Sequence, residues 1–287
     1  MALTNDQQLY LPTSLTDAMA ALVERGAEGA ALAGATWVMR AALRNETARS
    51  AYVAVSTLEE LQHVHVDANQ IDIGACVTHA QLVASIAHLA EYKALATAAR
   101  SAANPAVREV ATVGGNLCAS GFVASDLVPA LLCLDATVDL QTPRGSEQLP
   151  LDRFLALRDE FAPGWLVLRI RVPRHDGHSA HIRLPLRVAG DYPVAILSLA
   201  LRLAPAGHVI DARVVVGSVE RTARRWTRLE AGIIGQPLDA PALVDMASAY
   251  SSDFEGRDGV EVSGPYRVKV LPRLALRAIE SIRTRSE

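Results

Sequence analysis

The sequence predicts an α+β protein built from two domains. Its 287 residues exceed the length of one typical domain, and half of them are hydrophobic. The first 175 residues mix short strands and helices without a regular strand–helix–strand rhythm. Beyond residue 180, three long strands precede three helices, an order typical of an α+β domain. We place the boundary in the Gly- and Ser-containing turn over 175–181.

Local patterns predict the elements of the first domain. Ser14 is a typical N-cap for a helix that presents Leu15, Ala18, Met19 and Leu22 on one face. A short apolar run over 30–32 ends at Gly34 and precedes a helix over 37–43. Alternating or β-branched runs predict strands at 51–55, 63–66, 70–74, 137–141 and 165–172. Further helices are expected at 78–83, 91–103 and 126–132, and Gly114 and Gly115 are expected in a short extended segment.

The second domain reads as a block of antiparallel strands followed by a block of helices. Its strands are expected over 182–186, 193–203 and 208–217. Its helices are expected over 222–231, 240–250 and 263–282.

Composition excludes several classes of protein. A net charge of −3 and a pI of about 6.3 give no electrostatic support for nucleic-acid binding. The three cysteines, Cys76, Cys118 and Cys133, form no CxxC pair, so we expect neither a disulfide framework nor a zinc or iron–sulfur site in this chain. The N-terminus has no secretory signature, and the longest uncharged stretch, over 73–90, is too polar for a membrane span. We therefore expect a soluble cytoplasmic protein.

Two groups of histidines are candidates for a metal site. His175, His178 and His181 have a spacing that would gather metal ligands only on a helix, and Pro173 and Gly177 disfavour one. A solvated loop between the domains is the preferred interpretation, with adventitious metal binding as the alternative. His63 and His65 are expected on the solvent face of a strand. Motifs for a classical dinucleotide turn, a Walker A loop, a serine hydrolase and a zinc protease are absent.

The first informative loop runs through Leu32, Ala33, Gly34, Ala35, Thr36 and Trp37. Its small residues permit close approach of the backbone to a ligand. The N–H groups of residues 35–37 would then point at an anion at a helix N-terminus. An ordinary strand–turn–helix corner is the alternative.

The second informative segment contains Thr112, Val113, Gly114, Gly115, Asn116 and Leu117, with Ser120 and Asp126 following. Paired glycines in an extended segment reduce its stability, so they require a reason. A β-bulge is one reason. The other is close approach to a diphosphate, with Thr112 and Asn116 donating hydrogen bonds and Asp126 accepting from ribose hydroxyls.

These segments resemble the FAD-binding (medium) subunits of molybdenum-containing hydroxylases, the carbon monoxide dehydrogenase and xanthine dehydrogenase family. The resemblance rests on residues 33–36, 112–117 and 126–132. It continues through the strand and turn at 71–79, the Asp-Tyr-Pro-Val-Ala segment at 191–195 and the closing helix with Tyr266, Arg267 and residues 274–278. These segments occur in order over nearly the whole chain.

The resemblance implies a two-lobed FAD-binding domain of the vanillyl-alcohol-oxidase (PCMH) type over 1–175, with lobes of about 1–56 and 57–175. A smaller α+β domain follows over 180–287. The FAD diphosphate would lie between residues 32–37 and 112–116, and Asp126 matches an acidic residue on the adenosine side. Val167 and Leu168 match a strand position that touches the flavin. Arg183 stands where lysine is usual, and Tyr192 where a residue covers one flavin face.

Three departures from the family pattern concern the site directly. Ala35 replaces a common second glycine and would be strained at a positive φ. Asp126 follows Asn116 by ten residues instead of the usual nine, which weakens the match between Asp126 and the ribose-contacting residue of the family. Arg183 keeps the charge of lysine but not its shape.

The resemblance implies an FAD-carrying electron-transfer subunit that needs no acid, base or nucleophile of its own. Partner chains would hold a molybdenum–pterin cofactor in a large subunit and two [2Fe–2S] clusters in a small one, in a dimer of heterotrimers. Arg183 would favour electron density on the reduced flavin, and Tyr192 would limit access to one face. The alternatives are a stand-alone FAD oxidase or dehydrogenase of the same fold, and a non-catalytic assembly subunit that has lost flavin.

Overall fold

The computed structural model describes residues 7–186 and 192–283. The chain divides into two compact units that alternate along the sequence. Unit 1 contains residues 1–82, 105–120 and 136–173, and unit 2 contains residues 83–104, 121–135 and 174–287. The predicted boundary near residue 175 coincides with the last passage between the units, but unit 2 also takes two earlier segments.

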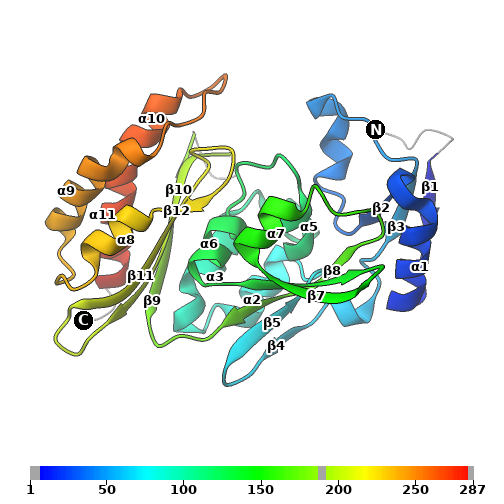
Figure 1. Ribbon diagram of the computed structural model, residues 1–287, viewed down its shortest axis with the longest axis horizontal. Helices are drawn as coiled ribbons and strands as arrows, with labels where there is room; N and C mark the ends of the chain where they lie inside the picture. Colours follow the sequence, from blue (N-terminus) through cyan, green and yellow to red (C-terminus); the bar gives the residue numbers. More distant parts are fainter. Residues whose placement is uncertain (1–6, 187–191, 284–287) are drawn as a thin grey trace. The chain divides into compact units, whose positions relative to one another are not determined.

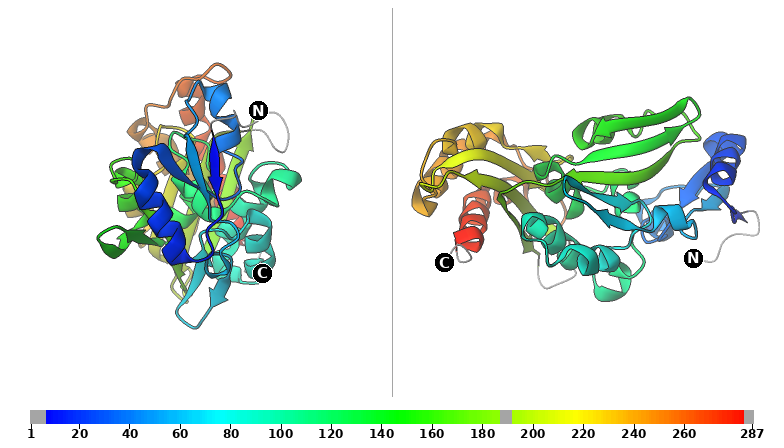
Figure 2. Two further views of the ribbon diagram at one scale, coloured as in Figure 1. Left: turned by 90° about the vertical axis from the view of Figure 1, so that its right-hand side faces the viewer. Right: turned by 90° about the horizontal axis from the view of Figure 1, so that it is seen from below.

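Unit 1 begins with a small parallel sheet, in the order β1–β3–β2, formed by β1 (Gln8–Tyr10), β2 (Gly29–Leu32) and β3 (Ala51–Ala54). Helix α1 (Leu15–Arg25) packs on β2 and β3 (Figure 2). Ser14 caps this helix by accepting a hydrogen bond from the N–H of Asp17, which confirms the predicted start. Ala18 and Leu22 are buried on its inner face, beside Val53.

The second sheet of unit 1 has five antiparallel strands in the order β4–β5–β8–β6–β7. Its strands are β4 (Val64–Val66), β5 (Gln70–Gly74), β6 (Thr137–Thr142), β7 (Gly145–Pro150) and β8 (Leu166–Pro173). The helices of this part are α4 (Pro105–Arg108), α5 (Val113–Cys118) and α7 (Leu151–Leu157), whereas α2 (His79–Ile86) begins in unit 1 and ends in unit 2. The 3₁₀ segments of unit 1 are η1 (Gly26–Glu28), η2 (Val38–Arg44) and η3 (Glu59–Leu61). The alternation of Ile71 and Ile73 with Gln70 and Asp72 gives this sheet one buried and one polar face.

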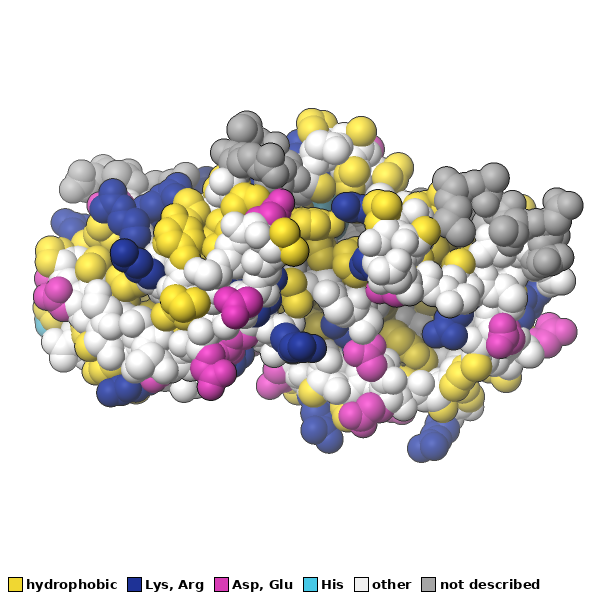
Figure 3. Space-filling model, turned by 90° about the horizontal axis from the view of Figure 1, so that it is seen from above, with side chains coloured by type: hydrophobic (Ala, Val, Ile, Leu, Met, Phe, Trp, Pro, Cys, Tyr) yellow, Lys and Arg dark blue, Asp and Glu magenta, His cyan; other side chains and the backbone are white. Residues whose placement is uncertain are grey.

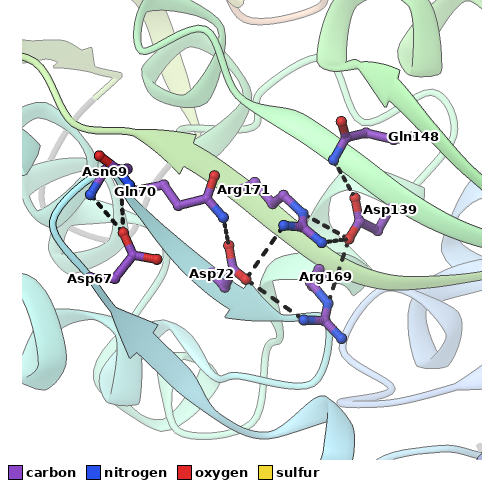
Figure 4. Close-up of polar contacts among 8 residues, drawn as sticks. All are labelled: Asp67, Asn69, Gln70, Asp72, Asp139, Gln148, Arg169 and Arg171. Atoms are coloured by element: carbon purple, nitrogen blue, oxygen red, sulfur yellow. Dashed lines mark hydrogen bonds and ion pairs between the residues drawn. The ribbon is translucent and has the colours of Figure 1, made fainter.

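Charged side chains connect three strands on the polar face of this sheet (Figure 4). Register places Asp72 opposite Arg171 and Asp139 opposite Arg169. Arg171 donates two hydrogen bonds to Asp139, at 2.8 and 2.7 Å, and this contact raises the pKa of its guanidinium. Arg169 lies 3.6 Å from each carboxylate. Two carboxylates thus balance two guanidinium groups, and such cross-strand pairs favour the native register.

Unit 2 is built around the antiparallel sheet β12–β11–β10–β9. Its strands are β9 (His178–Pro185), β10 (Pro193–Leu203), β11 (Val209–Gly217) and β12 (Arg224–Arg225). Helices α8 (Thr227–Ile233), α9 (Ala240–Tyr250), α10 (Gly264–Lys269) and α11 (Leu271–Arg283) follow, with η5 (Ser251–Asp253) between α9 and α10. The earlier segments supply η4 (Ala90–Tyr92), α3 (Lys93–Ser101) and α6 (Leu127–Cys133).

Helices cover both faces of the unit 2 sheet (Figure 1). On one face, α8, α9 and α11 bury Leu197, Leu199 and Val214 in a large apolar core. On the other face, α3 packs on β9 and β10, and α6 packs on β10 and β11. Because both faces are covered, β10 is buried from Pro193 to Leu201, and its sequence is a nearly continuous apolar run.

Several predicted elements need correction. Gly114 and Gly115 lie in helix α5, not in an extended segment, because Thr112 caps a helical turn there. The turn expected over 175–181 ends at Gly177, since His178 already begins β9. The helix expected over 222–231 starts only at Thr227, and Arg224 and Arg225 form β12. The helix expected over 37–43 is the 3₁₀ segment η2, and the closing helix is divided at Val270.

On the face seen in Figure 3, apolar side chains lie singly or in small groups among charged ones. Among the large hydrophobic side chains of the described residues, Leu11, Leu43 and Val260 are the most exposed. Within 7–186 and 192–283, no helix combines the length and the apolar character that crossing a membrane requires, and no group of His, Cys, Asp and Glu side chains could hold a metal ion.

Candidate functional site

The loop over 32–37 follows directly from β2, which ends at Leu32. Ala35 has a φ of +58°, so it occupies the left-handed region, in which alanine is strained, as the sequence predicted. Trp37 is held by Arg44, whose guanidinium lies 3.8 Å from the indole centroid and donates a hydrogen bond to the Trp37 carbonyl. Arg44 also donates a hydrogen bond to the carboxylate of Glu46, which holds the guanidinium in place. This hydrogen bond lowers the pKa of Glu46. The loop is therefore anchored at both of its ends.

Hydrogen-bond donors in this loop are available to a ligand. The N–H groups of Gly34, Ala35 and Thr36 donate to no residue within the described ranges. All three residues are only half-buried. Unpartnered amides on a turn before a helical segment form a typical anion-binding arrangement. The geometry fits the predicted contact with a diphosphate.

Gly34 brings the two predicted loops together. A Cβ on Gly34 would lie 1.8 Å from the carbonyl oxygen of Val110 and 3.1 Å from the Cα of Ala111. Only glycine permits this contact between backbones. Val110 lies two residues before Thr112, so the contact brings the first loop against the second segment. Val110 cannot be identified from the sequence, because nothing in its residue type signals the contact.

The segment around Gly114 and Gly115 is a short helix whose amides already have partners. The side chain of Thr112 accepts from the N–H of Gly115 at 3.1 Å, and its carbonyl accepts from Asn116. The N–H groups of Val113 and Gly114 donate to the carbonyls of Val77 and Ala75. The backbone donors for an anion therefore belong to the first loop.

The two glycines of this segment have different surroundings. A Cβ on Gly114 would lie 2.7 Å from the Cβ of Ala75, so this glycine permits packing on the turn after β5. A Cβ on Gly115 would meet only the Thr112 hydroxyl, at 2.8 Å. Gly115 is exposed and Asn116 is half-buried, so these two residues form the accessible part of the segment.

Leu168 occupies a β-bulge between β6 and β8. Leu140 pairs with Val167 and Asp139 with Arg169, which leaves Leu168 as the extra residue. Its carbonyl accepts a hydrogen bond from Ala75, the residue that packs under Gly114. Leu168 is half-buried, whereas Val167 is buried in the sheet. Of the two predicted flavin contacts in β8, Leu168 has the more accessible side chain.

Beyond α5, Ser120 donates a hydrogen bond from its hydroxyl to Asp159 at 3.1 Å. Arg158, beside Asp159, donates to the carbonyl of Leu117. These contacts anchor the end of α5 to the segment that follows α7. Ser120 is exposed, and its hydroxyl is engaged with Asp159.

Within unit 2, Asp126 lies just before α6 and is 4% exposed. Its Oδ1 lies 3.0 Å from the Nε of Arg183 and 3.3 Å from the Nε2 of His181. Its Oδ2 accepts no hydrogen bond from a described residue. An acceptor without a partner on a buried carboxylate fits the predicted contact with a ribose hydroxyl.

His181 contradicts the expectation of a solvated loop. It lies in β9, is 4% exposed, and contacts Ser198 through Nδ1 at 2.8 Å. The position is buried because α3 and α6 cover this face of the sheet. The sequence carries one signal of this environment: Ser198 is an isolated serine within the apolar strand β10, which indicates a buried polar partner.

Tyr192 is nearly half exposed, and its ring meets Phe122 edge to face at a centroid distance of 5.7 Å. Both residues belong to unit 2. The contact holds an aromatic ring at the surface, where a residue covering a flavin face is expected.

Comparison with known proteins gives two matching domain families. Residues 5–175 match the family described as FAD binding domain in molybdopterin dehydrogenase, and residues 181–282 match the CO dehydrogenase flavoprotein C-terminal domain. The chain is similar to the glyceraldehyde dehydrogenase medium chain of Sulfolobus acidocaldarius, at 28% identity over 79% of this chain and 81% of that protein. It is also similar to the carbon monoxide dehydrogenase medium chain of Afipia carboxidovorans, at 28% identity over 97% of each chain.

Among solved structures, a chain of the carbon monoxide dehydrogenase from Hydrogenophaga pseudoflava has the same fold. The TM-score is 0.90 with 24% sequence identity, and the match covers 99% of each chain. This likeness confirms the predicted α+β architecture.

Proposed function

This chain belongs to the family of FAD-binding subunits of molybdopterin dehydrogenases, and we propose that it carries FAD as the electron-transfer subunit of a three-part molybdenum hydroxylase. Large and small partner subunits hold the molybdenum–pterin cofactor and two [2Fe–2S] clusters in this proposal. Electrons pass from the clusters to FAD and then to an external acceptor. The complex is a cytoplasmic dimer of heterotrimers.

The observation that carries the proposal is the first loop. Three amide donors of residues 34–36 have no partner among the described residues, and Gly34 holds them against the backbone of Val110. An FAD diphosphate supplies the negative charge and acceptor oxygens that such a loop accommodates. Gly115 and Asn116 line the neighbouring surface without contributing backbone donors of their own.

Each remaining predicted residue keeps a separate role in the proposal. Leu168 touches the flavin from the bulge in β8, and Asp126 accepts a hydrogen bond from a ribose hydroxyl of FAD. Arg183 provides positive charge toward the flavin, and Tyr192 covers one flavin face. When bound, FAD supplies the exchange between two-electron and one-electron transfer, so the protein contributes position and electrostatics.

Purification of the chain followed by loading with FAD tests the proposal. We expect flavin absorption bands that persist after gel filtration, and co-purification of partner chains that contain molybdenum and iron. A folded chain that cannot be loaded with FAD would contradict the proposal and favour an assembly subunit without flavin. Flavin reduction by a small substrate, with no partner chain present, would instead favour a stand-alone oxidase or dehydrogenase.

A further inference from the structure

His181 and Ser198 form a buried polar pair to which the proposed function assigns no role. The register between β9 and β10 places the two residues directly opposite each other. The side chain of His181 is fully buried, and Ser198 is 0% exposed. On this face of the sheet, both lie next to α6, which follows Asp126. A hydrogen-bonded chain thus runs from Ser198 through His181 to Asp126.

The chemistry of the partners determines the direction of these hydrogen bonds. The carboxylate of Asp126 only accepts, so the Nε2 of His181 must carry the hydrogen that faces it. The Nδ1 of that tautomer is an acceptor, and the hydroxyl of Ser198 donates to it at 2.8 Å. The opposite tautomer would place two acceptors, Nε2 and Oδ1, 3.3 Å apart. Asp126 therefore selects the tautomer of His181, and the hydroxyl of Ser198 holds the ring in place by donating to the Nδ1 that this tautomer leaves unprotonated.

Asp126 is free to take part because it does not cap its own helix. Ser125 accepts the hydrogen bond from the N–H of Val128, and the side chain of Asp126 makes no capping bond. Its Oδ1 is directed toward His181 and Arg183, both on the same face of β9. This orientation leaves Oδ2 as an acceptor without a partner among residues 7–186 and 192–283.

We propose that His181 and Ser198 are positioning residues, which fix the carboxylate of Asp126 so that Oδ1 pairs with Arg183 and Oδ2 accepts a hydrogen bond from a hydroxyl of FAD. This inference rests on the proposed function. It assigns the hydroxyl-bearing part of the cofactor to Oδ2. It also explains the buried histidine, since a carboxylate held by a hydrogen bond from His181 and by the charge of Arg183 resists rotation better than one held by a single ion pair.

The test measures FAD affinity and the histidine tautomer in the full-length chain. We expect His181→Phe and Ser198→Ala each to raise the Kd for FAD by about tenfold or more, because each loosens a hydrogen bond to a charged group. His181→Gln should recover part of the affinity, since its amide can donate to Asp126 and accept from Ser198. Asp126→Asn should weaken binding further, and adding His181→Phe to it should have little additional effect.

Two controls separate positioning from general destabilisation. Ser179→Ala removes a buried serine of the same strand that bonds to Glu91 and Ala94, away from Asp126. His178→Phe alters an exposed histidine at the start of that strand. Both variants should retain the wild-type Kd, even where Ser179→Ala lowers the melting temperature. Equal weakening by Ser179→Ala would overturn the inference.

Nitrogen NMR of the histidine ring gives a readout that does not depend on FAD. We expect the Nε2–H tautomer for His181 in the wild-type chain and in Ser198→Ala, because the carboxylate of Asp126 requires this hydrogen in both. An Nδ1–H tautomer in the wild type would overturn the inference even if FAD binds. A wild-type chain with the expected tautomer but no FAD binding would instead contradict the proposed function, and with it the role assigned to Oδ2.

Discussion

Replacing Gly34 with alanine tests the contact that brings the first loop against Val110. Gly34 does not adopt a positive φ, so alanine fits its backbone conformation and the effect is purely steric. The new Cβ would lie 1.8 Å from the Val110 carbonyl oxygen, and the loops must separate by about 1.2 Å to bring this distance to 3.0 Å. Because the obstruction is backbone, no side chain can rotate away from it.

Two effects of known size follow from this separation. Overpacking of this kind typically lowers the free energy of unfolding by about 1–3 kcal/mol. The displacement of about 1.2 Å also moves the amides of residues 34–36 away from a bound diphosphate. Loss of one hydrogen bond to a charged group costs about 1.5–3 kcal/mol, so the Kd for FAD should rise by at least about tenfold.

Urea unfolding and titration of flavin fluorescence measure the two effects separately. Gly232→Ala in α8 is the matched control, because its Cβ would meet only the ends of the Met246 and Tyr250 side chains, at 3.2 Å. This control should bind FAD as the wild type does. A Gly34→Ala chain that is less stable yet binds FAD with unchanged Kd would refute the assignment of the diphosphate to this loop.

Three further predictions concern stability. Ala35→Gly should raise the free energy of unfolding by roughly 0.5 kcal/mol in urea titrations, because it removes left-handed strain and loses some backbone entropy; a decrease would contradict the strain. Burial raises the pKa of the Cys76 thiol from 9.0 to about 12. The protonated thiol therefore contributes fully to the free energy of unfolding below pH 9, and this contribution is lost as the pH rises toward 12. Wild-type stability should therefore fall more than that of Cys76→Ala over this range, and equal slopes would refute the shift. Arg267→Lys should cost about 2–3 kcal/mol, since the buried guanidinium donates to the carbonyls of Val194, Ser218 and Arg257; a thermal melt unchanged from wild type would show that these bonds are dispensable.

Regular periodicity made much of the fold predictable. The strand over 193–203 and the helix over 240–250 have the expected bounds, because a continuous apolar run and a cap with proline determine them locally. Arg224 and Arg225 were assigned to a helix, because their strand pairing with β11 depends on a contact that local sequence does not encode.

The site was predictable only where residue type limits conformation. Gly34 and Ala35 indicated a close approach and a left-handed turn, since few residues permit either. The roles of Val110 and His181 could not be read from their types. Val110 contributes a carbonyl that every residue has, and the environment of His181 is created by helices distant in sequence.

The alternation of the two units has a consequence for how this protein can be divided. A truncation at residue 175 would keep α3 and α6 but remove β9, β10 and β11, on which those helices pack. Their buried faces, including Leu95, Leu127 and Leu131, would then be exposed to water. The two matched families follow the linear order of the chain, whereas the two compact units take alternating segments of it. A gene fragment that ends at the family boundary is thus expected to yield an aggregation-prone product.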